Sequence, residues 1–312
     1  MILVGGENLI DFIQTGVEDG IPTYKAMPGG SPFNVAMAIG RQEVPVGYLT
    51  PVSSDPLGGL LAVRLEDSDV KLLAARRIEP TSLAVVALEN GLPSYQFYRE
   101  RTAERMVTLD GLRADTPDAV QAVYVGSLAI TGGADADAWA DYYCASKHEG
   151  VFTALDPNIR PAFIHDRPAY DKRLDQVLHH TDLLKFSDED LKWLVPGADL
   201  IDGARALAAR SSAKLVIVTK GGDGAFALNG DDVIEVPPAP VSNLKDTVGA
   251  GDTFMATLLA TLAQRECLSA GALVEMSPTD IETLIIRAAK AAAINCERSG
   301  CNPPRLSELG LT

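Results

Sequence analysis

The sequence has 312 residues, 46% of them hydrophobic and 22% charged, which is the composition of an ordinary soluble globular protein. Its formal net charge of −15 argues against a nucleic-acid or anionic-membrane surface, because phosphate groups must be met by clustered lysine and arginine. No stretch has the features of a signal peptide or the roughly 18 apolar residues of a membrane span. The four cysteines form neither a disulfide framework nor a zinc pattern, so we expect a protein of the reducing cytoplasm.

Short apolar runs predict strands at "ILVGG", "SLAVVAL", "AVYVGSL", "VFTALD", "DLLKF" and "KLVIVTKGG". From residue 121 onward they alternate with predicted helices at 134–148, 188–195, 201–211, 252–264 and 279–296. This alternation predicts an α/β fold in which helices cover both faces of a mostly parallel sheet. Near the N-terminus, "GGSPFNVAMAIGRQ" predicts a turn and a helix, with Ser31 as N-cap and Pro32 as the first helical residue.

Two polar and aromatic segments, 11–27 and 92–104, fit this alternation poorly because they are rich in turn residues. We expect them to form strands that project from the main sheet as a small lid. No Pro- or Ser-rich linker and no internal repeat divides the chain, so residues 1–312 are predicted to form one domain with this lid. The aromatic stretch "YQFY" on the lid would allow two lids to pair in a homodimer.

The stretch "DTVGAGDTF" places three small residues, Gly249, Ala250 and Gly251, directly before Asp252 and a predicted helix. Glycines let backbone N–H groups approach an anion closely, and the following helix adds its positive N-terminal end. At the edge of this cradle, Asp252 is placed to accept the proton of an attacking hydroxyl group. A glycine turn capped by Asp252 is the alternative interpretation, and this stretch alone does not separate the two.

A second glycine group, "VTKGGDGAF", follows the strand "KLVIV", and ligands of open α/β sheets collect at the carboxyl ends of strands. Thr219, Gly221 and Gly224 would let nucleotide phosphates approach the backbone closely. Lys220 would add a positive charge, whereas a tight β-turn is the simpler alternative for the whole group. Neither the P-loop pattern nor GxGxxG occurs, so nicotinamide chemistry has no support.

The third group lies near the N-terminus, where "GENLIDF" contains Asp11 and "PGGSPFN" contains Gly29, Gly30 and Asn34. A carboxylate and a carboxamide suit a polyol, because each can bridge adjacent hydroxyl groups. Taken singly, Asp11 is more simply a turn residue and Asn34 a solvated residue of a first helical turn.

Together these groups resemble the ribokinase-like (PfkB) carbohydrate kinases over essentially the whole chain. "GGSPFNVAMAIGRQEVPVGYLTPVSSDPLG" is similar to the N-terminal signature of that family, and "DTVGAGDTF" is similar to its C-terminal signature. The resemblance implies a three-layer α/β sandwich with a β-lid over the sugar, MgATP as the phosphoryl donor, and Asp252 as the catalytic base. By position, it also implies an anion hole of Gly249, Ala250 and Gly251; sugar contacts from Asp11, Gly29, Gly30 and Asn34; nucleotide contacts from Thr219, Gly221 and Gly224, with Ala289 behind the adenine; and a potassium site of Asp246 with carbonyl groups near Val248, Asn295 and Gly300.

One motif departs from the family pattern. Members usually carry N-x-x-E near the magnesium ion and the phosphates, whereas this chain reads "SDED", with Ser187 and Asp190 at the two positions. Hydroxyl and carboxylate oxygens still suit magnesium-bound waters, so we assign both residues to this role.

The sugar is predicted from subgroup features, because "GENLIDF", "FYRERTAE", "DPNIRP" and "CERSGCNPP" resemble the bacterial fructokinases more than the ribokinases. Phe97, Arg99 and Arg160 are then candidates for the ketose pocket. An ion pair of Arg160 with Asp156 or a neighbouring acid is an equal alternative. A 2-keto-3-deoxygluconate kinase stays open as the second reading, since two arginines would suit its substrate's carboxylate. A non-catalytic sugar or nucleotide sensor also stays open, although such a sensor would not need a base at Asp252.

Overall fold

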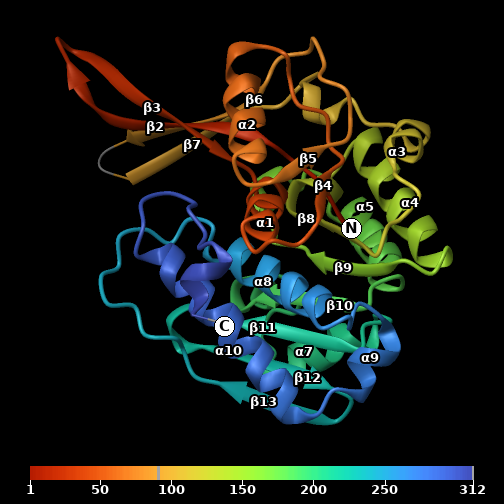
Figure 1. Cartoon of the computed structure of the whole chain (residues 1–312). Helices are drawn as coiled ribbons and strands as arrows, with labels where there is room; N and C mark the ends of the chain where they lie inside the picture. Colours follow the sequence, from red (N-terminus) through yellow and green to blue (C-terminus); the bar gives the residue numbers. More distant parts are fainter. Residues whose placement is uncertain (90–91, 311–312) are drawn as a thin grey trace.

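The computed structural model describes residues 1–89 and 92–310, and its architecture is shown in Figure 1. The strands of the central sheet are β1 (Ile2–Gly5), β4 (Val46–Tyr48), β5 (Val70–Leu72), β8 (Ala122–Gly126), β9 (Phe152–Asp156), β10 (Leu183–Ser187), β11 (Leu215–Thr219), β12 (Ala225–Asn229) and β13 (Asp232–Val236). Their order is β13-β12-β11-β10-β9-β8-β1-β4-β5. Pairing is parallel from β11 to β5 and antiparallel for β12 and β13, so the prediction of a mostly parallel sheet is confirmed.

Helices cover both faces of this sheet, because successive side chains of each buried strand point to opposite faces. Along β11, Leu215 and Ile217 belong to one hydrophobic core, whereas Val216 and Val218 belong to the other. The first core is completed by α1 (Ser31–Gly40), α2 (Pro56–Glu66), α8 (Ala250–Gln264), α9 (Ala270–Glu275) and α10 (Pro278–Cys296). The second is completed by α3 (Leu109–Asp115), α4 (Ala134–His148), α5 (Arg167–Leu178), α6 (Asp188–Leu194) and α7 (Leu200–Ala209).

The five predicted helices coincide with α4, α6, α7, α8 and α10 to within two residues at each end. The predicted start of α1 is wrong by one residue, since Gly30 is the N-cap and Ser31 is the first helical residue. The backbone explains this shift. Gly30 has φ 112°, and a Cβ atom there would lie 2.5 Å from the carbonyl oxygen of Glu7, so only glycine fits the turn.

A second, smaller sheet contains β2 (Leu9–Glu18), β3 (Ile21–Gly29), β6 (Ser82–Glu89) and β7 (Leu92–Tyr98), in the order β3-β2-β6-β7. Figure 1 shows the β2–β3 hairpin projecting away from the helices. Both predicted lid segments therefore contain strands of this sheet. The segment 92–104 is strand only up to Tyr98, and residues 103–105 form a 3-10 turn. The run "SLAVVAL" contributes a strand to the small sheet rather than to the central one.

Among the helices of the described residues, none combines the length and the hydropathy that crossing a lipid bilayer requires.

Candidate functional site

Asp252, the second aspartate of "DTVGAGDTF", is not the cap of its helix. Gly249 is the N-cap of α8, and Asp252 is the third residue of that helix. Instead of accepting a backbone N–H group, the Asp252 carboxylate accepts hydrogen bonds from the side chains of Ser31 (Oγ–Oδ1, 2.7 Å) and Asn34 (Nδ2–Oδ2, 2.8 Å). Both donors belong to α1, so the carboxylate joins the first turns of α1 and α8. This geometry removes the capping interpretation.

Asp252 is only 7% exposed, and burial raises its pKa above the usual range of aspartate. The hydrogen bonds from Asn34 and Ser31, and the positive charges of Lys185 and Arg160, act in the opposite direction without cancelling the effect of burial. Each carboxylate oxygen accepts one of these hydrogen bonds and keeps a further lone pair. A buried carboxylate with a raised pKa and an available lone pair is suited to accept a proton.

The turn before Asp252 needs its glycines. Gly249 has φ 75°, and a Cβ atom there would lie 2.3 Å from the Sγ of Cys301. The first N–H groups of an α-helix have no intrahelical acceptor, so this end of α8 presents donors to an anion. The N–H of Ala250 is partly engaged, since it donates to the carbonyl oxygen of Thr247 over 3.2 Å. A Cβ atom on Gly251 would approach the Nζ of Lys185 to 3.3 Å.

A cavity of about 560 Å³ lies between the end of β11 and the helices α8 and α10. Below, it is called the nucleotide cavity. Its lining includes six of the predicted residues, namely Thr219, Gly221, Gly224, Ala250, Gly251 and Ala289. The rest of its wall is largely apolar and includes the segment 237–239, Leu244 and Phe254, which no local motif marked beforehand.

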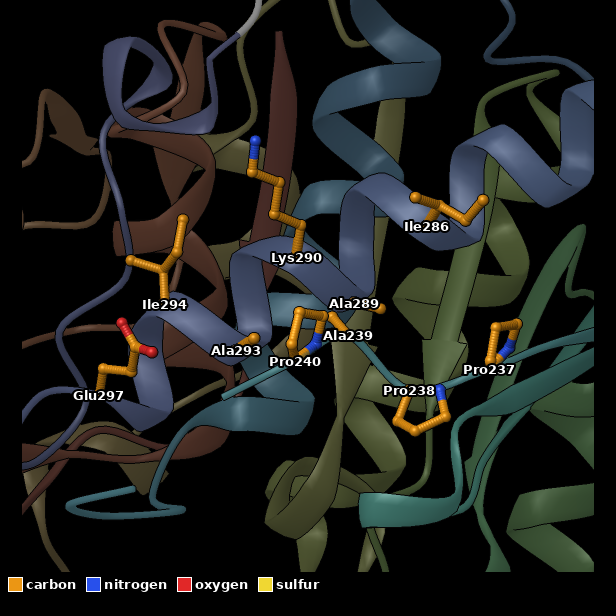
Figure 2. A pocket seen from close by; sticks show the side chains of 10 residues that line it. All are labelled: Pro237, Pro238, Ala239, Pro240, Ile286, Ala289, Lys290, Ala293, Ile294 and Glu297. Atoms are coloured by element: carbon orange, nitrogen blue, oxygen red, sulfur yellow. The ribbon is translucent and has the colours of Figure 1, made fainter. Parts of the chain in front are cut away.

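The structure does not bring Lys220 into the nucleotide cavity, because its ammonium group lies 3.6 Å from the Oε2 of Glu235 on β13. Ala289 lies on the wall between this cavity and a second hollow of about 440 Å³. Figure 2 shows that hollow, with α10 on one side and the segment Pro237–Pro240 on the other. The place of Ala289 behind the adenine stays a prediction, and the structure shows that this residue lines both cavities.

A third cavity, of about 420 Å³, continues from the nucleotide cavity and shares Thr219, Gly221 and Gly251 with it. It is called the phosphate-end cavity below. All four residues of the "SDED" motif line it, including Ser187 and Asp190. Ser187 and Asp190 form a capping box at the start of α6, and the Asp190 carboxylate also accepts the N–H of Ile159 over 2.7 Å. Since Asp190 already accepts three hydrogen bonds, it has little capacity left for a direct metal bond.

Two charged residues of this region were not predicted as site residues. The ammonium group of Lys185 on β10 lies 2.7 Å from the Oδ2 of Asp156 at the end of β9, and both side chains are buried. Lys185 lines the phosphate-end cavity. The signal in the sequence was a lysine inside the apolar strand "DLLKF", since an unpaired lysine is almost never fully buried.

Of the predicted sugar residues, Asn34 contacts Asp252 directly, whereas Asp11, Gly29 and Phe97 belong to strands of the small sheet. Asp11 is on β2 beside Gly29, where an added Cβ atom would lie 2.4 Å from the Oδ2 of Asp11. Burial raises the pKa of Asp11 to about 6. Phe97 on β7 packs edge-on against Phe163, with ring centroids 4.4 Å apart.

The two candidate arginines differ in their partners. Arg99 forms a buried ion pair with Glu104, with its Nε 2.8 Å from the Oε1. Arg160 lines the phosphate-end cavity and donates to the carbonyl oxygens of Asn158 and Ile159. The alternative pairing of Arg160 with Asp156 or a neighbouring acid is wrong, because among the described residues Arg160 donates to backbone carbonyl oxygens and forms no ion pair, whereas Asp156 pairs with Lys185.

The four residues predicted for a potassium site are brought together. The Asp246 carboxylate accepts the N–H groups of Val248 (3.0 Å) and Gly300 (2.8 Å), and the Asn295 amide donates to the carbonyl oxygen of Val248 (2.8 Å). The set offers oxygens only, from carbonyl groups and one carboxylate, which is the chemistry that a hard cation requires. In the part of the chain that the structure describes, no cluster of three or more His, Cys, Asp or Glu side chains could hold a metal ion.

Comparisons with known proteins agree with this arrangement. A family model described as pfkB family carbohydrate kinase matches residues 1–308. A fructokinase of Rhizobium leguminosarum bv. trifolii is 37% identical over 273 residues, which are 86% of this chain and 82% of that protein. A fructokinase of Klebsiella pneumoniae is 31% identical over 265 residues, which are 84% of each chain. The solved structure of a fructokinase with bound ATP from Xylella fastidiosa has a TM-score of 0.87 and 27% identity, covering 99% of this chain and 96% of that one.

Proposed function

Because this chain belongs to the pfkB family of carbohydrate kinases, we propose that it transfers the γ-phosphoryl group of ATP to a primary hydroxyl group of fructose. The observation that carries the proposal is the buried Asp252 carboxylate. It directly follows Ala250 and Gly251, which line the nucleotide cavity, and it accepts hydrogen bonds from α1, the helix that follows β3 of the small sheet. A sensor would not need a buried base at this position, so an enzyme is the better reading.

The reaction follows from these positions. The hydroxyl oxygen forms a bond to the γ-phosphorus, the bond from that phosphorus to the bridging oxygen breaks, and ADP leaves. The hydroxyl proton passes to a carboxylate oxygen of Asp252. The N–H groups at the start of α8 stabilise the charge on the transferring group. Magnesium entering with ATP would offset phosphate charge, and Ser187 and Asp190 would hold it through waters, because Asp190 has little capacity left for a direct bond to the ion.

Fructose is favoured over 2-keto-3-deoxygluconate by the partners of the two arginines. A sugar acid would need arginines that are available to its carboxylate, but Arg99 is already paired with Glu104 in a buried position. Within the described residues, Arg160 is hydrogen-bonded to carbonyl groups alone, so only one of the two arginines would be available to a substrate carboxylate. The names of the relatives from Rhizobium leguminosarum and Klebsiella pneumoniae point to the same sugar.

The test is a phosphorylation screen over fructose, ribose, 2-keto-3-deoxygluconate, glucose and nucleosides. We expect fructose to give the highest kcat/KM. If the kcat/KM for 2-keto-3-deoxygluconate exceeds that for fructose by about tenfold or more, the assignment of the sugar is wrong and the sugar acid is the substrate. Such a ratio corresponds to about 1.4 kcal/mol of discrimination in the transition state. If no sugar of the panel leads to consumption of ATP, the proposed function itself is contradicted.

The small sheet is proposed to act as a lid over the sugar that excludes water, so that ATP is not hydrolysed. Val17 and Ile21 are 59% and 67% exposed at the tip of its hairpin, and this apolar surface would pair with a second copy in a homodimer. A titration with fructose tests the closing of the lid, and analytical ultracentrifugation tests the homodimer. Hydrogen exchange in β2 and β3 should slow as fructose binds, and the mass obtained from sedimentation should be that of two chains. Unchanged exchange contradicts the closing lid, and a single-chain mass contradicts the dimer.

We propose that potassium binds between Asp246 and the carbonyl groups near Val248, Asn295 and Gly300. Asp246 and Val248 directly precede the glycine turn, so a cation there would order the anion hole. Replacing a bulky organic cation by K⁺ at constant ionic strength should therefore raise kcat. An unchanged kcat across this exchange would contradict the cation site and leave the kinase assignment intact.

A further inference from the structure

A buried lysine faces the place where the phosphoryl group would be transferred. Lys185 is 3% exposed and lies near the carboxyl end of β10, where its ammonium group is 2.7 Å from the Oδ2 of Asp156. The register of the parallel pair β9–β10 joins Leu184 to Leu155, so Lys185 and Asp156 follow one position further along both strands. Asp156 is in turn held by the N–H of Asn158, which donates to its Oδ1 over 3.2 Å.

The ammonium group is close to the start of α8. A Cβ atom placed on Gly251 would be 3.3 Å from the Nζ of Lys185, so the two groups are in contact distance. Lys185 and Gly251 both line the phosphate-end cavity, and Gly251 also lines the nucleotide cavity. The ammonium group therefore lies where the two cavities meet, beside the N–H donors of the glycine turn.

The surroundings keep this lysine charged. Asp156, Asp190 and Asp252 together raise the pKa of Lys185, although burial alone would lower it. An ammonium group has three donors, and the hydrogen bond to Asp156 uses one of them. The remaining donors are available to an anion that enters the phosphate-end cavity.

The charge of the site gives such a donor a function. The buried Asp190 lines the phosphate-end cavity, and the charges of Asp156 and Asp252 also act on Lys185. A nucleoside triphosphate would bring further negative charge to the same place. Asp190 already accepts hydrogen bonds from Ile159 and Ser187, so it can act on a magnesium ion only through waters and not as a direct ligand. A fixed positive side chain at the transferring phosphate would act together with magnesium on this charge, and Lys185 and Arg160 are the cationic residues that line the cavity.

We propose that Lys185 is a catalytic residue whose ammonium group donates to the transferring phosphoryl group, and that Asp156 is the positioning residue that holds it. This inference rests on the proposed kinase function. A purely structural ion pair would not need to line a cavity, and buried pairs contribute little net stability.

The protein offers a matched control. Lys147 on α4 forms a second lysine–aspartate pair with Asp182, directly before β10, with the Nζ 2.5 Å from the Oδ1. Neither residue of that pair lines the nucleotide cavity or the phosphate-end cavity. Lys147→Met thus removes a lysine–aspartate pair at the opposite end of the same strand, although the Lys147 side chain is more exposed, at 29%, than that of Lys185, at 4%.

The experiment compares Lys185→Met, Lys147→Met and the unaltered protein in three measurements: kcat, the dissociation constants of ATP and ADP without sugar, and the melting temperature. For Lys185→Met we expect kcat to fall by roughly 10²–10³-fold, as for loss of one donor to a transition-state oxyanion. The preference for ATP over ADP should fall by roughly tenfold or more, because only ATP carries the γ-phosphate that the ammonium group contacts. Lys147→Met should change neither quantity.

A folded Lys185→Met protein with unaltered kcat and an unaltered ATP:ADP preference would overturn the proposal. If Lys185→Met does not fold, the double variant Lys185→Met/Asp156→Asn removes both charges of the pair, and its kcat and ATP:ADP preference decide in the same way. The nucleotide measurement needs no sugar, so it reports on Lys185 even if fructose proves to be the wrong acceptor. A protein that binds ATP yet phosphorylates no sugar would instead contradict the proposed function.

Discussion

Asp252→Asn should lower kcat by roughly 10²–10⁴-fold, the range of general-base catalysis, while the protein stays folded and binds ATP. Asparagine keeps the shape of the side chain and can still accept the hydrogen bond from Ser31. The amide N–H of the new asparagine can donate to Asn34 once the Asn34 amide flips. The Oδ1 of Asn34 is buried without a hydrogen-bond partner, and the flip would turn this oxygen toward position 252. Only the capacity to take the hydroxyl proton is lost.

A matched control exists in Asp280, which is also the third residue of its helix, α10, but lies on the surface and caps that helix with Ser277. Asp280→Asn should leave kcat unchanged. The measurements are kcat, the dissociation constant of ATP and the melting temperature of both variants beside the unaltered protein. An Asp252→Asn protein that folds, binds ATP and keeps more than about a tenth of kcat would show that Asp252 is not the base.

The pH profile gives the same prediction a second readout. The base acts only as a carboxylate, and burial raises the pKa of Asp252. Activity of the unaltered protein should therefore fall as the pH falls through this raised pKa, at a higher pH than an exposed aspartate would produce. The residual activity of Asp252→Asn should lack that decline.

Gly249→Ala should reduce kcat by roughly 10²-fold or more and should also lower the melting temperature. The new Cβ atom would meet the Sγ of Cys301 at 2.3 Å, and alanine at φ 75° carries a strain of about 1–3 kcal/mol. The turn can relieve both only by moving, which displaces N–H donors that must face the transferring phosphate; losing one such donor typically costs about 10²–10³-fold.

The control for this change is Gly271→Ala in α9, where an added Cβ atom meets nothing within 4 Å. Alanine is favoured over glycine in a helix by about 1 kcal/mol, so this variant should be as stable as the unaltered protein or slightly more so. Its kcat should not change. Wild-type kcat in a folded Gly249→Ala protein would mean that the turn does not supply the anion hole.

Features set by local sequence were predictable. The start and end of α8 and α10 follow from small or capping residues beside long apolar runs, and the glycines near Asp252 mark the turn. The start of α1 was misplaced because serine is a common N-cap, whereas the left-handed backbone at Gly30 settled the boundary.

Features set by distant contacts were not predictable in the same way. The pair of Lys185 with Asp156 depends on β9 lying next to β10, and the hydrogen bond from Ser31 to Asp252 depends on α1 meeting α8. Lys220 shows the converse error. It follows a strand that ends at the nucleotide cavity, yet its ammonium group lies 3.6 Å from Glu235 on β13, a contact between two different strands that the local motif does not reveal.

The two hydrogen bonds that hold Asp252 come from Ser31 and Asn34, which precede it in the chain by 221 and 218 positions. A ribosome makes the α1 donors early and the α8 carboxylate only after four-fifths of the polypeptide has been synthesised. If Asp252 is the base that we propose, no shorter nascent chain can transfer a phosphoryl group, because activity requires residues from both ends of the polypeptide to meet.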